Sequence, residues 1–252
     1  MTMDYDRRCL NEFMFLQARV EHYFVELTID CPYGLAEQAC FYQAMFSGLT
    51  ERQMEIFLAA GYRRNGNCLY TMHCRHCRAC VPIRLKVDDF RPNRNQRRVW
   101  QKNSDVEIEL DSLQLDEEHL SLCDLFLRTR YPREQNRAQG YYGEFFCNTI
   151  TDTAQVQYRL DGQLVGASII DLGQNFINAV YFYFDPQHGG RSLGTYNILA
   201  LVDMCRKLGM TYLYLGYYIA EVSAMNYKAR FQPCQLRQDH GWVDFRSCDE
   251  MT

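Results

Sequence analysis

The C-terminal half of the sequence constrains the fold most, because it predicts a run of strands followed by one helix and one further strand. Alternation of apolar and polar residues, with short connections, predicts an antiparallel meander of three strands, over 155–160, 163–171 and 176–184. A glycine-rich loop at 188–194 follows, and apolar residues at helical spacing then predict a helix that ends at Gly209. Residues 211–218 predict the last strand of this series.

This order of elements resembles the acyl-CoA N-acyltransferase (GNAT) arrangement. There, the loop between a central strand and its helix binds the pyrophosphate of acyl-CoA through backbone N–H groups. The resemblance implies an α+β fold, in which helices flank a mixed, largely antiparallel sheet. The loop of this chain reads Arg191-Ser-Leu-Gly194, and Tyr196 stands where the usual acetyl-CoA pattern has a second glycine or alanine. This departure leaves room for an acyl donor that is not carried on CoA.

Charge is distributed unevenly along the chain. Residues 60–102 hold eleven Lys or Arg against two Asp, a net charge of +9 in a chain whose total is −4. A charge run is often a solvated face, but one with so few acids suits a polyanion such as a nucleic-acid backbone. The densest part supplies the candidate RNA-binding residues, which are Arg91, Arg94, Arg97 and Arg98.

Twelve cysteines are many for a chain of 252 residues. Most are expected to be reduced and buried, because no export signal is recognisable. Residues 73–80 have C-x2-C-x2-C spacing flanked by two histidines, and this spacing lets two thiolates face one metal or cluster edge. The three cysteines of this segment need a fourth ligand, which is Cys31, His73 or His76. The other interpretation of the segment is a tightly packed cysteine knuckle without metal. The candidate ligands of a Zn or Fe–S site are Cys31, Cys74, Cys77 and Cys80.

The N-terminal half predicts a smaller set of helices and strands. A helix is expected to begin at Thr50, with Gln53 in the capping-box position, and to end at Gly61. Residues 64–67 predict a hairpin turn, and 37–47 predict a short helix.

A division into two domains follows from these patterns. Residues 1–104 are expected to form a basic, cysteine-containing α/β subdomain, and residues 105–252 the GNAT-like acyltransferase domain. The second domain is expected to open with an exposed strand that has one buried face, at 105–111, and a helix at 116–130.

The two halves together point to one class of donor. One half predicts an acyltransferase with an atypical donor loop, and the other predicts a surface for a nucleic acid. A donor that is both an acyl ester and a nucleic acid is an aminoacyl-tRNA.

Short motifs in both halves resemble the arginyl/leucyl-tRNA–protein transferase family. Those of the N-terminal half are Cys31-Pro-Tyr, Gly61-Tyr-Arg-Arg-Asn-Gly, Cys77-Arg-Ala-Cys-Val-Pro-Ile-Arg84 and Phe90-Arg-Pro-Asn-Arg-Asn-Gln-Arg-Arg98. Those of the C-terminal half are Phe184-Asp-Pro, Ser192-Leu-Gly-Thr-Tyr, Tyr214-Leu-Gly-Tyr-Tyr-Ile and Tyr227-Lys-Ala-Arg-Phe-Gln-Pro233. They cover nearly the whole chain, and their order and spacing together are specific. The length and the Cys-Arg-Ala-Cys-Val-Pro form are most similar to the short bacterial branch, the aspartate/glutamate leucyltransferases.

The resemblance implies transfer of leucine from Leu-tRNA to the α-amine of a protein that begins with Asp or Glu. The product would carry an N-terminal Leu, a destabilising residue in the N-degron pathway. No cofactor is required for the chemistry, because the aminoacyl ester is already activated. The preference for Leu over Arg rests on the family branch alone. One departure is Tyr131-Pro-Arg133, where the family often has an Arg-His pair after the tyrosine.

Candidate site residues follow from the demands of this reaction. Backbone N–H groups at 215–217 are candidates to stabilise the oxyanion, and Tyr217 or Tyr218 to relay a proton to the leaving ribose hydroxyl, unless both tyrosines are simply packed. The acidic side chain of the acceptor requires a cation held in a fixed position. Lys228 and Arg230 are the first candidates for this cation, and the alternative is that both only face solvent on a surface helix. The full substrate-binding set is Lys228, Arg230, Tyr227, Arg191, Arg63 and Arg64.

Other functions remain open at this point. They are arginyl transfer from Arg-tRNA, acetyl-CoA-dependent N-acetylation with ribosome docking, and RNA binding by a metal-bearing, degenerate acyltransferase. No run of about 18 apolar residues predicts a membrane span. No apolar signal segment is recognisable either, so a cytoplasmic location is expected.

Overall fold

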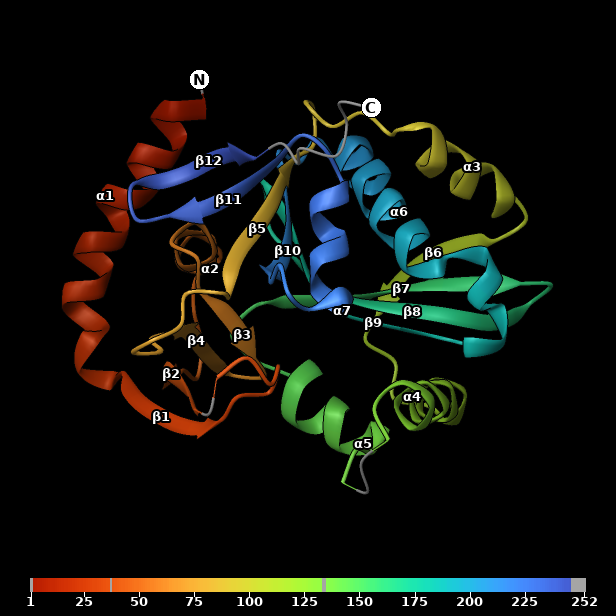
Figure 1. Ribbon diagram of the computed structural model, residues 1–252, viewed down its shortest axis with the longest axis horizontal. Coiled ribbons are helices and arrows are strands. Elements are labelled where there is room, and N and C mark those ends of the chain that lie inside the picture. Colours follow the sequence, from red (N-terminus) through yellow and green to blue (C-terminus); the bar gives the residue numbers. More distant parts are fainter. Residues whose placement is uncertain (1, 37, 133–134, 246–252) are drawn as a thin grey trace.

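Two sheets contain the strands of the chain (Figure 1). The computed structural model describes residues 2–36, 38–132 and 135–245. The four-stranded sheet has the order β1-β2-β4-β3 and consists of β1 (Val25–Asp30), β2 (Gln38–Met45), β3 (Arg63–Asn65) and β4 (Cys68–Met72). The eight-stranded sheet has the order β12-β11-β5-β10-β9-β8-β7-β6. Its strands are β5 (Val81–Lys86), β6 (Glu107–Ser112), β7 (Asp152–Leu160), β8 (Gln163–Leu172), β9 (Phe176–Phe184), β10 (Tyr212–Tyr218), β11 (Cys234–Gln238) and β12 (Gly241–Phe245).

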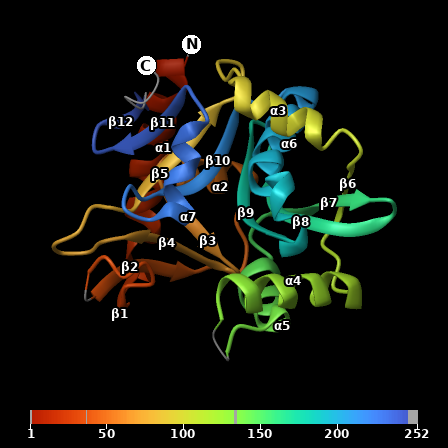
Figure 2. The ribbon, with the colours of Figure 1, turned by 45° about the vertical axis from the view of Figure 1, so that its right-hand side comes forward.

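Helices cover both faces of the eight-stranded sheet. The longer ones are α1 (Thr2–Val20), α2 (Glu51–Ala59), α3 (Arg94–Lys102), α4 (Glu117–Arg130) and α6 (Leu193–Leu208). The shorter ones are α5 (Ala138–Tyr141), α7 (Ser223–Asn226), η1 (Glu21–Tyr23), η2 (Tyr142–Phe146), η3 (Pro186–Arg191) and η4 (Tyr227–Arg230). α6 packs on one face of the sheet, α4 and α5 pack on the other, and α3 lies against α6 (Figures 1 and 2).

The main core fixes α6 against the central strands. Leu201 and Val202 of α6 belong to one buried cluster with Ile177 of β9 and Leu213 of β10. Each such side chain contributes roughly 1.5–3 kcal/mol when it is fully buried. Gly209 ends the helix with a φ of 71°, a left-handed conformation that suits glycine. The position of the first turn of α6 relative to β9 and β10 is therefore determined by packing.

The expected order of strands, loop, helix and strand is confirmed, and so is the GNAT-like architecture. The capping box of α2 is present, with reciprocal hydrogen bonds between Thr50 and Gln53. The short helix expected at 37–47 is wrong, because these residues form β2, whose backbone pairs with β1 on one side and β4 on the other. β6 is a strand as expected, but all six residues are exposed, since it is an edge strand paired with β7 alone.

The N-terminal part of the chain contributes to the larger sheet. β5 lies between β11 and β10, although it comes from the first 104 residues. The division of the chain after residue 104 therefore stays a prediction. Among the described residues, no helix combines the length and apolar character that a membrane crossing requires.

Candidate active site

A cavity opens where two neighbouring strands separate. Among the described residues of the larger sheet, β9 and β10 form the parallel pair. They are paired at three positions only, Phe176–Tyr212, Ile177–Leu213 and Asn178–Tyr214. A bulge in β10 between Tyr214 and Gly216 marks the point of separation. The cavity has a volume of about 590 Å³ and lies between the separated strands and the start of α6.

The walls of this cavity are apolar and positively charged. Phe126 of α4, Tyr181 of β9 and Ile198 of α6 contribute aromatic and aliphatic surface. The charged side chains on the walls are Arg63, Arg130 and Lys228. Among the described residues that line the cavity there is no Asp or Glu. The site therefore suits an anionic group together with a neutral, apolar one.

Arg63 fills the gap between the two strands. Its Nη1 donates to Oδ1 of Asn178 at 2.6 Å, and its Nη2 donates to the backbone oxygen of Ala179 at 3.0 Å. Gly216 lies directly against the guanidinium, since a Cβ at this position would be 3.1 Å from Nη2. Its φ of 86° also favours glycine. The bulged backbone of β10 thus makes room for a buried cation.

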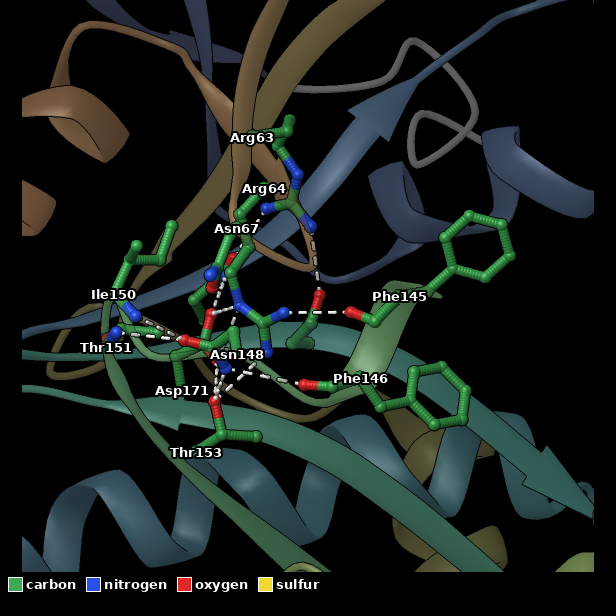
Figure 3. A network of polar contacts seen from close by, with 12 residues as sticks. Arg63, Arg64, Asn67, Phe145, Phe146, Asn148, Ile150, Thr151, Thr153 and Asp171 are labelled. Carbon is green, nitrogen blue, oxygen red and sulfur yellow. Dashed lines mark hydrogen bonds and ion pairs between the residues drawn. The ribbon is translucent and has the colours of Figure 1, made fainter. Parts of the chain in front are cut away.

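A buried polar network, which begins at Asn178, holds the guanidinium of Arg63 in place (Figure 3). Arg64 and Asp171 form an ion pair at 2.6 Å, and neither side chain is exposed. Asp171 also accepts hydrogen bonds from Oγ1 of Thr153 at 2.8 Å and Nδ2 of Asn178 at 2.7 Å. Asn178 therefore connects the Asp171 carboxylate to Arg63. The guanidinium nitrogens of Arg64 all donate within this network, and substrate binding by Arg64 stays a prediction.

Lys228 lies on the opposite side of the gap from Asn178. Its Nζ donates to the backbone oxygen of Tyr217 at 3.0 Å and is 3.6 Å from Sδ of Met225. Burial, together with the positive charge of Arg63, lowers the pKa of Lys228 to about 7. The structure thus places Lys228 and Arg63, two of the predicted substrate-binding residues, in one cavity.

The two candidate catalytic tyrosines point to opposite faces of β10. Tyr217 lines the cavity, and burial raises the pKa of its hydroxyl, which has no hydrogen-bond partner at normal distance within the described chain. Tyr218 packs against Phe245, with 5.9 Å between ring centroids, and does not line the cavity. Alternation along a strand explains the difference. Of the two tyrosines, only Tyr217 lines the cavity, and a proton relay by either of them stays a prediction. Tyr227 lines the cavity, as expected for substrate binding.

Two further predicted binding residues lie outside the cavity. The side chain of Arg230 is exposed. Its backbone oxygen accepts a hydrogen bond from Gln96. Arg191 forms an ion pair with Asp105 at 2.8 Å and does not line the cavity. Residues near both arginines in the sequence, Lys228 and Ser192, do line the cavity. The direction in which each arginine side chain points depends on tertiary packing. Neither side chain lines the cavity, and substrate binding by Arg230 and Arg191 stays a prediction.

The basic segment is joined to elements that form part of the cavity wall. Arg91 precedes α3, whose Arg94, Arg97 and Arg98 are all exposed, as Arg91 is. α3 is attached to two segments, η4 and η3, each of which also supplies a residue of the cavity wall. Nε2 of Gln96 donates to the backbone oxygen of Arg230 at 3.0 Å, and Nζ of Lys102 donates to that of Gly190 at 2.7 Å. The positions of these arginines are compatible with RNA binding, which stays a prediction.

The cysteine segment does not form a ready metal site. The backbone N–H of Cys40 donates to Sγ of Cys74 at 3.4 Å. Burial, and then the nearby thiols of Cys74, Cys77 and Cys31, raise the pKa of Cys80 to about 12. Within the described chain, no three His, Cys, Asp or Glu side chains gather where they could hold a metal ion. A metal on Cys31, Cys74, Cys77 and Cys80 therefore stays a prediction.

The sequence patterns missed several residues of the site. Arg130 lies at the end of a predicted helix, and Tyr33 is part of a motif, but neither position suggested a place in the cavity. Asp171 and Asn178 are polar residues within otherwise apolar strands, and a buried polar residue usually has a partner. That signal was present, although the sequence does not say that the partners are Arg64 and Arg63.

Comparisons with known proteins agree with this geometry. Family models described as "Arginine-tRNA-protein transferase, N terminus" and "Arginine-tRNA-protein transferase, C terminus" match residues 29–98 and 118–238. An aspartate/glutamate leucyltransferase of Chromobacterium violaceum is 34% identical over 234 residues, which cover 90% of this chain and 95% of the relative. Another, of Marinobacter nauticus, is 37% identical over 190 residues, or 73% of this chain and 78% of the relative.

One solved structure shares the fold over most of the chain. The crystal structure of FemX superposes with a TM-score of 0.51 over 95% of this chain and 77% of its own, at 9% sequence identity. At this identity the likeness concerns the fold alone.

Proposed function

The chain belongs to the arginine-tRNA-protein transferase family, and from this premise we propose that it transfers leucine from Leu-tRNA to proteins beginning with Asp or Glu. The acceptor nucleophile is the N-terminal α-amine, and the bond broken is the ester between leucine and the 3′-terminal ribose. The product is a protein with one additional N-terminal leucine. Charged tRNA and nascent proteins meet in the cytoplasm, which is where we propose that the reaction takes place.

The charge of the cavity is the observation that carries this proposal. A leucyl side chain is neutral and suits the apolar walls formed by Phe126, Tyr181 and Ile198. An arginyl side chain would bring a cation close to Arg63 or Arg130, with no carboxylate among the described lining residues. Two like charges about 4 Å apart repel by roughly 4 kcal/mol near a protein surface. This cost favours Leu-tRNA over Arg-tRNA as the donor.

The same charges favour an acidic acceptor. Arg63 and Lys228 both line the cavity at this gap, and a carboxylate bound there would contact the guanidinium of Arg63. Charge-assisted hydrogen bonds of this kind contribute about 1.5–3 kcal/mol. We assign the Asp or Glu side chain of the acceptor to this end of the cavity, which supports discrimination against a neutral N-terminal residue.

The donor approaches from the side of α3. The exposed Arg94, Arg97 and Arg98 provide a phosphate-binding surface, and Gln96 and Lys102 join α3 to η4 and η3, which also supply residues of the cavity wall. The acceptor stem on this surface would direct its 3′ end between β9 and β10. Much of the rate then comes from holding the ester and the amine together, since the ester needs no further activation.

A transfer assay tests the proposal. Purified protein is incubated with radiolabelled Leu-tRNA and with peptides that differ only in an N-terminal Asp, Glu or Ala. We expect label in the Asp and Glu peptides, at a kcat/KM at least about tenfold above that of the Ala peptide. Absence of label in every peptide, with either Leu-tRNA or Arg-tRNA as donor, would contradict the proposed function.

A further inference from the structure

We propose that Lys228 removes the proton from the acceptor's α-ammonium group and so generates the amine that attacks the ester. This inference rests on the proposed function and assigns Lys228 a chemical step in addition to its place beside the acceptor's carboxylate. The assignment begins with the position of Lys228 in the cavity, and the charges around it support it.

Lys228 lies where the reacting amine must be. Its Nζ faces the cavity from η4 and donates one hydrogen bond to the backbone oxygen of Tyr217, beside the gap between β9 and β10. No carboxylate among the described lining residues holds it as a cation. A neutral amine in this position keeps its donor bond to Tyr217 and has a lone pair available for a proton.

The charged and titratable groups that face Lys228 favour its neutral form. From β3 the guanidinium of Arg63 adds to the effect of burial, and the two lower the pKa of Lys228 to about 7. From the far end of α4, Arg130 adds a further positive charge to the cavity walls. The tyrosines on the other walls are neutral at this pH, because burial raises the pKa of each; they are Tyr33, Tyr70, Tyr181, Tyr217 and Tyr227.

Binding of the acceptor then raises the pKa of Lys228 towards that of the α-amine. The acidic side chain of the acceptor brings a negative charge, which raises the pKa of a nearby lysine. The α-amine of a protein has a pKa of roughly 7.7–8, so the raised pKa of Lys228 moves towards that of its proton donor. Proton transfer is most effective when the two values are close.

The step balances as follows. Nζ of Lys228 accepts one proton from the α-ammonium, and the nitrogen lone pair attacks the ester carbonyl carbon. The C–O bond to the ribose breaks as the tetrahedral intermediate collapses, and the nitrogen's second proton ends on the leaving ribose oxygen. Lys228 then releases its proton to water. Tyr217 does not compete as a base, because its hydroxyl keeps its own proton at neutral pH.

The test compares Lys228→Arg with Lys207→Arg. Arginine is of similar length and can donate to the acceptor's carboxylate, but it is already protonated and does not accept a proton at neutral pH. Lys207 is exposed at the end of α6, with 75% of its side chain accessible, and serves as the matched control. Steady-state rates are measured with Leu-tRNA and an Asp-initiated peptide from about pH 6 to pH 9.

We expect Lys228→Arg to lower kcat at pH 7 by about tenfold while the peptide KM changes less than about threefold, because roughly a tenth of an amine with a pKa of about 7.7–8 is already neutral at pH 7. The lost rate should recover as the pH rises through the pKa of the peptide's own amine, roughly 7.7–8. A kcat within about threefold of wild type at pH 7 would overturn the inference. Wild-type protein without transfer activity would instead contradict the proposed function.

A second variant addresses folding. If Lys228→Arg loses its native circular dichroism spectrum, Lys228→Gln is used, which is smaller and neutral. The same displacement of the pH–rate profile towards the pKa of the peptide amine is expected, together with a higher peptide KM. A Lys228→Gln profile that coincides with the wild-type profile would equally overturn the inference.

Discussion

Removing two arginines from α3 should weaken tRNA binding by an amount that depends on salt. Arg94 and Arg98 are one helical turn apart and exposed, and neither forms an ion pair or hydrogen bond within the described chain. Both guanidiniums are therefore free for phosphates. The perturbation is the double variant Arg94→Ala with Arg98→Ala, which leaves the buried Gln96 and its capping bond to Asn93 in place.

The expected magnitude follows from counterion release. Each phosphate neutralised by a protein contributes about 0.9 to the slope of log K against log salt on a duplex. Two lost contacts reduce the slope by about 1.8. If the two proteins bind equally at about 1 M salt, the double variant then binds about 60-fold more weakly at about 0.1 M.

The assay is tRNA binding by fluorescence anisotropy at several salt concentrations. The matched control is Arg7→Ala with Arg19→Ala, two exposed arginines of α1, which lies on the opposite side of the molecule from α3 (Figure 1). We expect the control to keep the wild-type slope to within about 0.3. An unchanged slope in the α3 variant, or an equal change in the control, would refute the assignment of this surface to RNA.

Four further predictions follow from the structure. Asp171→Asn should leave Arg64 buried without its partner, which costs about 3–5 kcal/mol, and should lower the Tm by about 6–20 °C; a drop below about 2 °C in a thermal melt would contradict the importance of the pair. Gly216→Ala should raise the peptide KM about tenfold, because the new Cβ crowds Nη2 of Arg63 and the positive φ is unfavourable; unchanged kinetics would separate Gly216 from the site. Arg63→Gln should reduce the preference for an Asp over an Asn peptide by about 10- to 150-fold, and a retained preference would place the acceptor's carboxylate elsewhere. Elemental analysis of anaerobically purified protein decides between the predicted metal site and a metal-free cysteine knuckle: about one equivalent of Zn, or of an Fe–S cluster, would establish the site, and fewer than ~0.2 equivalents of any metal would establish the knuckle.

The sequence predicted the segments of the site better than its side chains. The alternation of apolar and polar residues, together with the glycines at turns and at the helix end, located β7 to β10 and α6, because these signals depend on local conformation and burial. The direction of a side chain at a strand separation depends on neighbours far away in sequence. Tyr217 and Tyr218 are equivalent by pattern, and only the pairing of β10 shows that Tyr217 faces the cavity.

The adjacent arginines of β3 illustrate the same limit. Arg63 and Arg64 are identical in type and next to each other, yet Arg64 is neutralised by Asp171 and Arg63 reaches the cavity. The partners come from β8 and β9, more than 100 residues later, as the separation of 107 residues between Arg64 and Asp171 shows. Period-two alternation places neighbours on opposite faces, but it does not reveal which face carries a carboxylate.

The donor preference tests the central claim most directly, since that claim is the positive charge of an acid-free cavity. The measurement is kcat/KM for Leu-tRNA and for Arg-tRNA with one Asp-initiated peptide at one salt concentration. We expect Leu-tRNA to be favoured by at least about 100-fold, which corresponds to roughly 2.7 kcal/mol of the charge repulsion estimated above. Equal use of the two donors, or preference for Arg-tRNA, would contradict the account.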